Sequence, residues 1–158
     1  MSFTLEPARL SDAARIAVMS MRLIEAGLTP SWPAERIVRH MRHPENVVLT
    51  ARHAGRLAAF AIMQFGETTA HLNLLAVETD QQRRGLGRAL LNWLEQSALT
   101  AGTFVIQMEL RAGNVRARAF YEALGYRETG RVPGYYQSLE DAIQMARDLR
   151  VGHGAAQV

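Results

Sequence analysis

A loop rich in glycine and arginine is the part of the chain best suited to chemistry. The stretch "QQRRGLGRALLNWLEQ", Gln81 to Gln96, places glycines among several arginines and then continues with apolar residues at helical spacing. Glycine adopts backbone angles closed to other residues, and without a Cβ it lets a ligand come close. A helix that begins there directs unpaired N–H groups and the positive end of its dipole at the ligand. The stretch therefore predicts a loop that holds an anion such as a pyrophosphate.

The same loop allows other interpretations. A nucleotide P-loop ends in Gly-Lys-Ser/Thr, and the sequence contains no lysine. The dinucleotide fingerprint needs a third glycine where Leu90 stands, and it usually lies in the first βα unit. A glycine-containing turn with solvated arginines would explain the loop without a ligand. From the loop alone, the pyrophosphate cradle and the plain turn both remain open.

The elements that must position this loop follow from hydrophobic periodicity and from helix and turn signals. Helices are expected at residues 12–26, capped by Ser11 and ended at Gly27, at 33–43, from Leu86 through Ala98, and at 114–124, capped by Asn114 and ended at Gly125. Strands are expected at residues 3–8, 46–53, 56–65, 69–77, 103–111, from 126 onward, and at 141–149. The order βααβββαβαββ predicts an α/β fold, a mixed sheet covered by helices in one three-layer domain.

Length and composition limit the class of protein. The 158 residues fit one domain, expected at 1–150, with a disordered tail at 151–158. The net charge is +3 and the eighteen basic residues, all arginine, are scattered, so no nucleic-acid partner is expected. No apolar run suits a bilayer or a signal peptide, which predicts a cytoplasmic protein without membrane contact. There is no cysteine and the five histidines lack metal-ligand spacing, so neither a disulfide nor a metal is expected.

Two sequence blocks resemble the GNAT superfamily, the acetyl-CoA-dependent N-acetyltransferases. The run Gln82-Arg83-Arg84-Gly85-Leu86-Gly87 is similar to the family's Gln/Arg-x-x-Gly-x-Gly/Ala signature, and it follows the strand segment "LLAV". The block "ELRAGNVRARAFYEALGY" resembles the family's strand, Asn-capped helix and Tyr-x-x-Leu-Gly-Tyr/Phe ending. The resemblance covers roughly residues 47–149 and is greatest to the ribosomal-protein alanine N-acetyltransferases. It implies a GNAT-like fold and makes coenzyme A the source of the pyrophosphate.

The resemblance also implies which residues contact the coenzyme. The backbone of the strand before the loop is expected to pair with the pantetheine amides, with the Val77 amide as a donor to the thioester carbonyl. Asn114 is expected to contact the pantetheine or phosphate portion while it caps its helix. The expected cofactor-binding residues are Leu75, Ala76, Val77, Arg83, Arg84, Gly85, Leu86, Gly87, Arg88 and Asn114.

Two residues are the main candidates for proton transfer, and His71 is an alternative base, although an exposed histidine in a strand is more often structural. Glu109 interrupts an apolar strand, where a carboxylate is costly unless paired, and a raised pKa there would suit a general base. A surface glutamate paired with Arg111 or Arg52 is the alternative. Tyr121 lies at the edge of the buried face of its helix, as a half-buried phenol or as a boundary tyrosine that packs on the sheet. By resemblance, Glu109 matches the family's base and Tyr121 its thiolate-protonating acid.

The residues predicted to bind the acceptor lie around the start of the last strand. Tyr135, Tyr136, Glu140 and Asp141 combine two aromatics and two acids that suit a basic N-terminal peptide or a polyamine, although a solvated turn explains them too. The predicted function is direct acetyl transfer from acetyl-CoA to a primary amine, first of all a protein N-terminal α-amine, by a monomer or homodimer. The alternatives are a small amine (a polyamine, amino acid or amino sugar) and a non-catalytic acyl-CoA-binding sensor domain.

Overall fold

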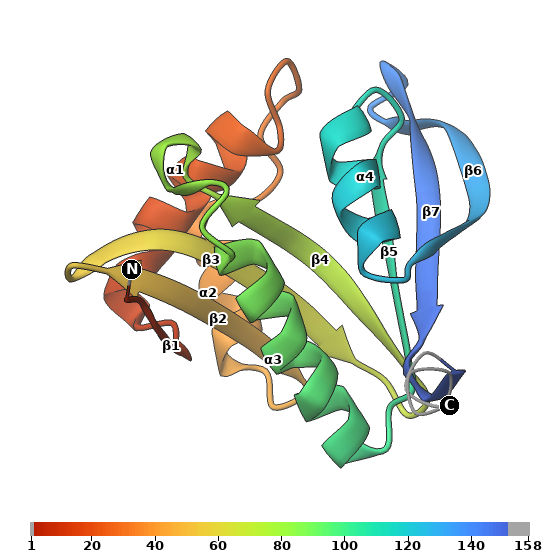
Figure 1. Ribbon diagram of the computed structural model, residues 1–158. Coiled ribbons are helices and arrows are strands. Elements are labelled where there is room, and N and C mark those ends of the chain that lie inside the picture. Colours follow the sequence, from red (N-terminus) through yellow and green to blue (C-terminus); the bar gives the residue numbers. More distant parts are fainter. Residues whose placement is uncertain (1, 152–158) are drawn as a thin grey trace.

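A seven-stranded sheet forms the centre of the structure, a computed structural model that describes residues 2–151 (Figure 1). The strands are Thr4–Pro7 (β1), Asn46–His53 (β2), Arg56–Phe65 (β3), Thr69–Val77 (β4), Val105–Arg111 (β5), Arg127–Tyr136 (β6) and Glu140–Asp148 (β7). Their order in the sheet is β1-β2-β3-β4-β5-β7-β6. Neighbouring strands pair antiparallel except β4 and β5, which run parallel.

Helices cover both faces of the sheet and make two separate cores. On one face lie Ala13–Leu23 (α1) and Ala34–Arg42 (α2), whose buried residues pack on β2, β3 and β4. On the other lie Leu86–Ala101 (α3) and Val115–Ala123 (α4). Short 3-10 turns at Leu10–Asp12 and Thr79–Gln81 precede α1 and α3. The result is a three-layer arrangement with the sheet in the middle (Figure 1).

The element order predicted from sequence, βααβββαβαββ, is confirmed, and the segment at 141–149 is a strand, inserted between β5 and β6. The predicted start of the first helix is wrong. Ser11 does not cap it, because a 3-10 turn precedes α1 and the Asp12 carboxylate accepts a hydrogen bond from the Arg9 N–H at 2.8 Å. Val151, predicted to begin the tail, belongs to a helical turn, and 152–158 lie outside the described residues.

Strand β4 contains a bulge that changes which way its side chains face. Leu72 pairs with Met63 and Leu74 pairs with Ile62, so Asn73 has no partner on β3. A bulge of this kind bends a strand and re-aims the residues beyond it. Accordingly Leu72 belongs to the core under α3, whereas Leu74 belongs to the core under α1.

The two parallel strands separate just where the bulge occurs. Strands β4 and β5 pair over three residues, Thr69–His71 with Val105–Gln107, and then diverge (Figure 1). Backbone groups on the facing edges of the divergent parts are therefore released from the sheet. The opening between them is where the candidate site lies.

Within residues 2–151, no helix is long and apolar enough to span a bilayer.

Candidate active site

A cavity of about 680 Å³ fills the opening between β4 and β5. Its walls include residues 72–77 of β4 and 108–111 of β5. Phe120 and Tyr121 of α4 line it from one face of the sheet, and Leu23 and Ile24 at the end of α1 line it from the other. The cavity therefore passes through the plane of the sheet, so that two molecules entering from opposite faces would meet inside it.

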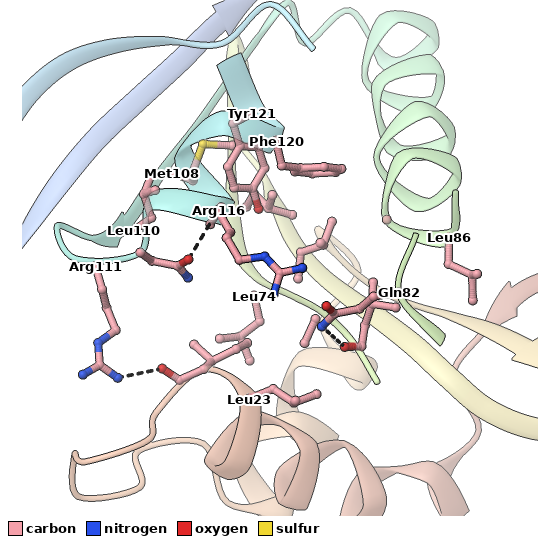
Figure 2. A pocket seen from close by; sticks show the side chains of 18 of the residues that line it. Leu23, Leu74, Gln82, Leu86, Met108, Leu110, Arg111, Arg116, Phe120 and Tyr121 are labelled. Carbon is pink, nitrogen blue, oxygen red and sulfur yellow. Dashed lines mark hydrogen bonds between the residues drawn. The ribbon is translucent and has the colours of Figure 1, made fainter. Parts of the chain in front are cut away.

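The predicted anion loop forms one end of this cavity (Figure 2). Arg83 and Gly85 have left-handed backbone angles, with φ of 64° and 82°, and Gly85 is the N-cap of α3 without a side-chain cap. The first backbone bond of the helix runs from Ala89 N–H to Gly85 C=O. The N–H groups of residues 86–88 thus have no partner in the described chain, which is the arrangement that binds anions.

Most of the predicted loop residues line the cavity, namely Arg83, Gly85, Leu86, Gly87 and Arg88. Arg84 is not among the lining residues, and its guanidinium donates to the Gln81 side chain at 3.2 Å. Gly87 packs closely on α4, because a Cβ there would lie 3.3 Å from the Phe120 ring.

The exposed edge of β4 continues from the loop along the cavity. Glu78 N–H bonds to Ala58 C=O, so by antiparallel alternation Ala76 also faces β3, while the N–H and C=O groups of Leu75 and Val77 face the opening. The Val77 carbonyl accepts from the Gln82 side chain at 3.1 Å (Figure 2). All three predicted strand residues line the cavity, but only Leu75 and Val77 present backbone groups to it.

Helix α4 brings two polar side chains to the same wall. Asn114 caps the helix as predicted, its Oδ1 accepting from Ala117 N–H at 3.1 Å, and it also lines the cavity. Arg116 was not singled out from the sequence. Figure 2 shows its side chain extending from α4 into the cavity toward Gln82. A second positive charge therefore lies opposite the anion loop.

Glu109 lines the cavity from β5 and is bound by side chains of three other strands. Its Oε1 lies 2.6 Å from His71 Nε2 on β4, and it accepts from the Tyr135 hydroxyl on β6 at 3.3 Å. Gln144 is its register partner on β7, and the side chain of Gln144 contributes to lowering the pKa of Glu109. The alternative sequence interpretation, a pair with Arg111 or Arg52, is wrong: Arg111 pairs with Glu140, and Arg52 with Glu6 and Asp12.

The raised pKa expected for Glu109 is also wrong. Its pKa is lowered, chiefly by the hydrogen bond with His71, and burial, which acts in the opposite direction, does not outweigh this. The side chain keeps 15% of its surface exposed, so desolvation is incomplete. Glu109 is therefore held as a carboxylate at neutral pH rather than as a partly protonated acid.

Tyr121 lines the wall of the cavity that lies opposite the exposed edge of β4 (Figure 2). It is 7% exposed and packs edge-on against Phe120 and Tyr126, and burial raises its pKa far above the ordinary value. No residue in the described chain hydrogen-bonds its hydroxyl. The phenol is thus fully protonated at neutral pH, with its donor unused inside the protein.

The four predicted acceptor residues separate into two pairs. Tyr136 lines the cavity and Tyr135 bonds Glu109, with the two rings perpendicular at 5.0 Å. Glu140 and Asp141 instead hold local structure: Glu140 accepts from the Arg111 guanidinium at 2.7 Å and from Gly113 N–H at 2.8 Å, and Asp141 accepts from Gly134 N–H at 2.9 Å. Both carboxylates are therefore engaged by partners within the protein.

The loop after α1 is tied to that hairpin across the cavity mouth. The Arg111 guanidinium donates to the carbonyls of Ile24 and Ala26 at 3.1 and 2.6 Å. Figure 2 shows the first of these bonds as the dashed line beside Arg111. Thr29 and Gln137 form a reciprocal pair, at 2.8 Å from Thr29 N–H and 2.7 Å from the Gln137 amide. The loop, β5 and the hairpin therefore form one connected rim on the side opposite the anion loop.

Comparison with known proteins agrees with this geometry. The model of the acetyltransferase (GNAT) family matches residues 17–126. The chain belongs to the GNAT acetyltransferase family.

Individual GNAT relatives are similar over much of their length. The ribosomal protein bS18-alanine N-acetyltransferase of Salmonella typhimurium is 46% identical over 104 residues, 64% of this chain and 69% of the relative. The N-alpha-acetyltransferase RimI of Mycobacterium tuberculosis is 33% identical over 143 residues, 87% of each. The crystal structure of the ribosomal-protein-S18-alanine N-acetyltransferase from Escherichia coli superimposes with a TM-score of 0.81 at 31% identity, over 94% of each chain.

Membership in the GNAT family confirms the predicted enzyme class, an acetyltransferase that uses acetyl-CoA. Within residues 2–151 no group of three or more histidine or acidic side chains lies together as a metal site. The site contains two residues that the sequence did not single out, Arg116 and Gln144, whereas His71, expected only as an alternative base, bonds Glu109. No sequence pattern marks Gln144 as a site residue. In β5, the polar residues of "VIQMELR" recur at every second position and therefore share one face of the strand.

Proposed function

We propose that this enzyme transfers the acetyl group of acetyl-CoA directly to the N-terminal α-amine of a protein. The observation that carries the proposal is the cavity through the sheet. It connects an anion cradle on the α3 side with a polar rim on the α1 side, and Glu109 and Tyr121 line it between them. Two substrates bound from opposite faces would meet at these two side chains.

The cradle would hold the coenzyme by its pyrophosphate. The free N–H groups of residues 86–88 and the positive end of α3 supply fixed donors, and Arg83, Arg88 and Arg116 add charge. The backbone of Leu75 and Val77 then suits the pantetheine amides, which would add to β4 like a short strand. The thioester would then lie beyond Val77, in the middle of the cavity.

The chemical step needs a free amine, because an α-amine with a pKa of about 7.7–8.0 is largely protonated below pH 7.4. Glu109 would remove the proton as the ionised base, directly or through water. The neutral amine attacks the thioester carbon and the Val77 N–H stabilises the oxyanion. Collapse breaks the C–S bond, and the second proton leaves the nitrogen and ends on the departing sulfur, which gives the amide and the coenzyme thiol. Tyr121 would meet this sulfur with its unused hydroxyl. Its raised pKa makes it first a hydrogen-bond donor to the developing negative charge.

Transfer would be direct. The sequence has no cysteine that could carry the acetyl group as a thioester on the protein. Both substrates must then be bound at once, which the passage through the sheet permits.

The acceptor side favours a chain end over a free small amine. Its rim joins the loop after α1 to the β6–β7 hairpin, and Tyr135 and Tyr136 offer flat apolar surfaces with hydroxyl groups. Glu140 and Asp141 are engaged within the protein, so the two acids expected to grip a polyamine are taken up elsewhere. The relatives named as acting on ribosomal-protein alanine point the same way.

The test is acetylation of three amines at equal concentration. These are a peptide with a free N-terminal alanine and an internal lysine, the same peptide with its α-amine blocked, and spermidine. We expect the mass of the first peptide to rise by one acetyl group, located by fragmentation on the α-amine, and no change in the second. Faster acetylation of spermidine or of the blocked peptide would replace the proposed acceptor.

A further inference from the structure

The pair formed by His71 and Glu109 connects the cavity with solvent. His71 lies opposite Gln107 in the parallel register, so Glu109 is two residues further on and shares its face. The atoms His71 Nε2 and Glu109 Oε1 are 2.6 Å apart. Glu109 lines the cavity with 15% of its side chain exposed, while His71 lies outside that lining with 34% exposed.

Glu109 alone is poorly suited to hold an amine proton. Its carboxylate is bonded by His71, Tyr135 and Gln144, and these contacts lower its pKa. A base is most effective when its pKa lies near the working pH, so a strongly stabilised carboxylate is a weak proton acceptor. Imidazole is the side chain whose charge normally changes between pH 5 and 8. The hydrogen bond therefore joins the carboxylate in the cavity to an imidazole that is partly open to solvent.

The groups that surround this pair come from the neighbouring strands and from α2. The register neighbours of His71 are Gln64 on β3 and Gln107 on β5, both uncharged. Facing Glu109 are Tyr135 from β6 and the neutral Gln144 from β7. From α2, Arg36 lies near enough to Tyr135 to oppose the rise of that phenol's pKa, which burial and Glu109 cause.

We infer that His71 and Glu109 act as one proton-accepting unit, with Glu109 at the cavity and His71 as the outlet to solvent. The acceptor ammonium loses one proton, and the pair gains it and changes from net charge −1 to 0. Water then takes that proton from the pair before the next turnover. His71 is thus a positioning and proton-carrying residue that acts through Glu109.

The inference rests on the proposed reaction, and His71→Gln tests it. The glutamine amide can still donate to Glu109 but cannot take up a proton. We expect kcat/KM for the alanine peptide to fall about tenfold or more at pH 6.5 and to approach wild type near pH 9, where the α-amine is already free. His53→Gln is the matched control, because His53 lies at the end of β2 and contacts the Ser2 carbonyl.

A His71→Gln enzyme that follows wild type across the whole pH range would overturn the inference, since hydrogen bonding alone would then explain His71. The same conclusion would follow from a loss that is equal at every pH. If the glutamine variant loses its fold, His71→Asn repeats the test. If the wild-type enzyme acetylates spermidine but no peptide, the proposed acceptor fails, and the comparison is repeated with spermidine below pH 9.

A double-variant cycle gives a second, independent measurement. If the pair is one unit, His71→Gln should cost little once Glu109 is glutamine, so the double variant should match Glu109→Gln within about twofold. Losses that multiply would show that the two residues act separately and would contradict the inference. Coenzyme affinity, measured by calorimetry, should be unchanged in all three variants.

Discussion

The two ends of the cavity are built from different kinds of group. The end that we assign to the coenzyme consists of backbone N–H groups at the start of α3, shaped by left-handed angles at Arg83 and Gly85. The end that we assign to the acceptor consists of side chains from β4, β6 and β7 that converge on Glu109 of β5. The first is encoded within a few consecutive residues, whereas the second exists only after β4, β5, β6 and β7 have assembled. Variants should therefore separate binding of the coenzyme from chemistry on the acceptor.

The largest effect should come from Glu109→Gln at the acceptor end. General-base assistance is typically worth about 10²–10⁴-fold, so turnover should fall by that order, most strongly at low pH where free amine is scarce. Coenzyme affinity should not change, because the cradle lies at the other end. Steady-state rates across pH together with calorimetry measure both. Wild-type rates at low pH would remove Glu109 from the mechanism.

Tyr121→Phe should have the next largest effect. It removes a hydroxyl that has no partner in the described chain, so turnover at saturating acetyl-CoA should fall about tenfold or more while the denaturant midpoint stays close to wild type. A structural tyrosine would behave in the opposite way, because an orphaned buried partner costs about 1–3 kcal/mol. Tyr126→Phe is the matched control, since that hydroxyl donates to Glu95 at 2.9 Å and its loss should lower stability.

At the coenzyme end, Gly85→Ala should weaken coenzyme A binding at least tenfold, or about 1.4 kcal/mol. A Cβ on Gly85 meets no atom within 4 Å, so the substitution acts through the strained φ of 82° and the shape of the cradle. Gly102→Ala is the matched control: it has φ of 81°, equal free space, and lies at the far end of the same helix. Both should lose about 1–2 kcal/mol of stability, but only the first should lose affinity.

Equal affinity in the two glycine variants would show that the loop does not hold the coenzyme. Gly87→Val is a poorer probe, because its side chain would press on Phe120 and Val77 and disturb the core as well as the cradle.

The smallest effect should come from the rim. Gln137→Ala removes the reciprocal pair with Thr29, and exposed hydrogen bonds contribute about 0.5–1.5 kcal/mol, so the peptide KM should rise roughly two- to tenfold. The KM for acetyl-CoA should not change. Gln96→Ala, on the exposed surface of α3, is the control. If only the KM for acetyl-CoA changed, the rim would belong to the coenzyme site and not to the acceptor site.

The difference between the two ends also explains what the sequence could predict. The loop was predictable because Gly85 must adopt a positive φ and the helix start follows it directly in the chain. The strands were predictable because their apolar runs are bounded by turns. Strand β7 was predictable because its residues alternate between the two faces of the strand. The start of α1 was not, since Ser11 and Asp12 are both good caps and the choice depends on the Arg9 backbone.

The network around Glu109 was beyond sequence reasoning for a physical reason. Its partners lie 38, 26 and 35 positions away along the chain, at His71, Tyr135 and Gln144, and only the register of four strands brings them together. Glu140 and Asp141 illustrate the same limit, because their partners too are set by the folded structure. Two acids beside two tyrosines suit a basic ligand, but hairpin geometry turns them onto Arg111 and onto backbone N–H groups.

The most direct test of the account is a crystal structure with a conjugate that joins coenzyme A to the α-amine of an alanine peptide through an acetyl bridge. The account predicts that the pyrophosphate lies on the N–H groups of residues 86–88 and that the bridge passes between β4 and β5 beside Glu109 and Tyr121. The peptide should leave on the α1 side, past Tyr135 and Tyr136. A pyrophosphate bound away from the start of α3, or both halves of the conjugate on one face of the sheet, would contradict it.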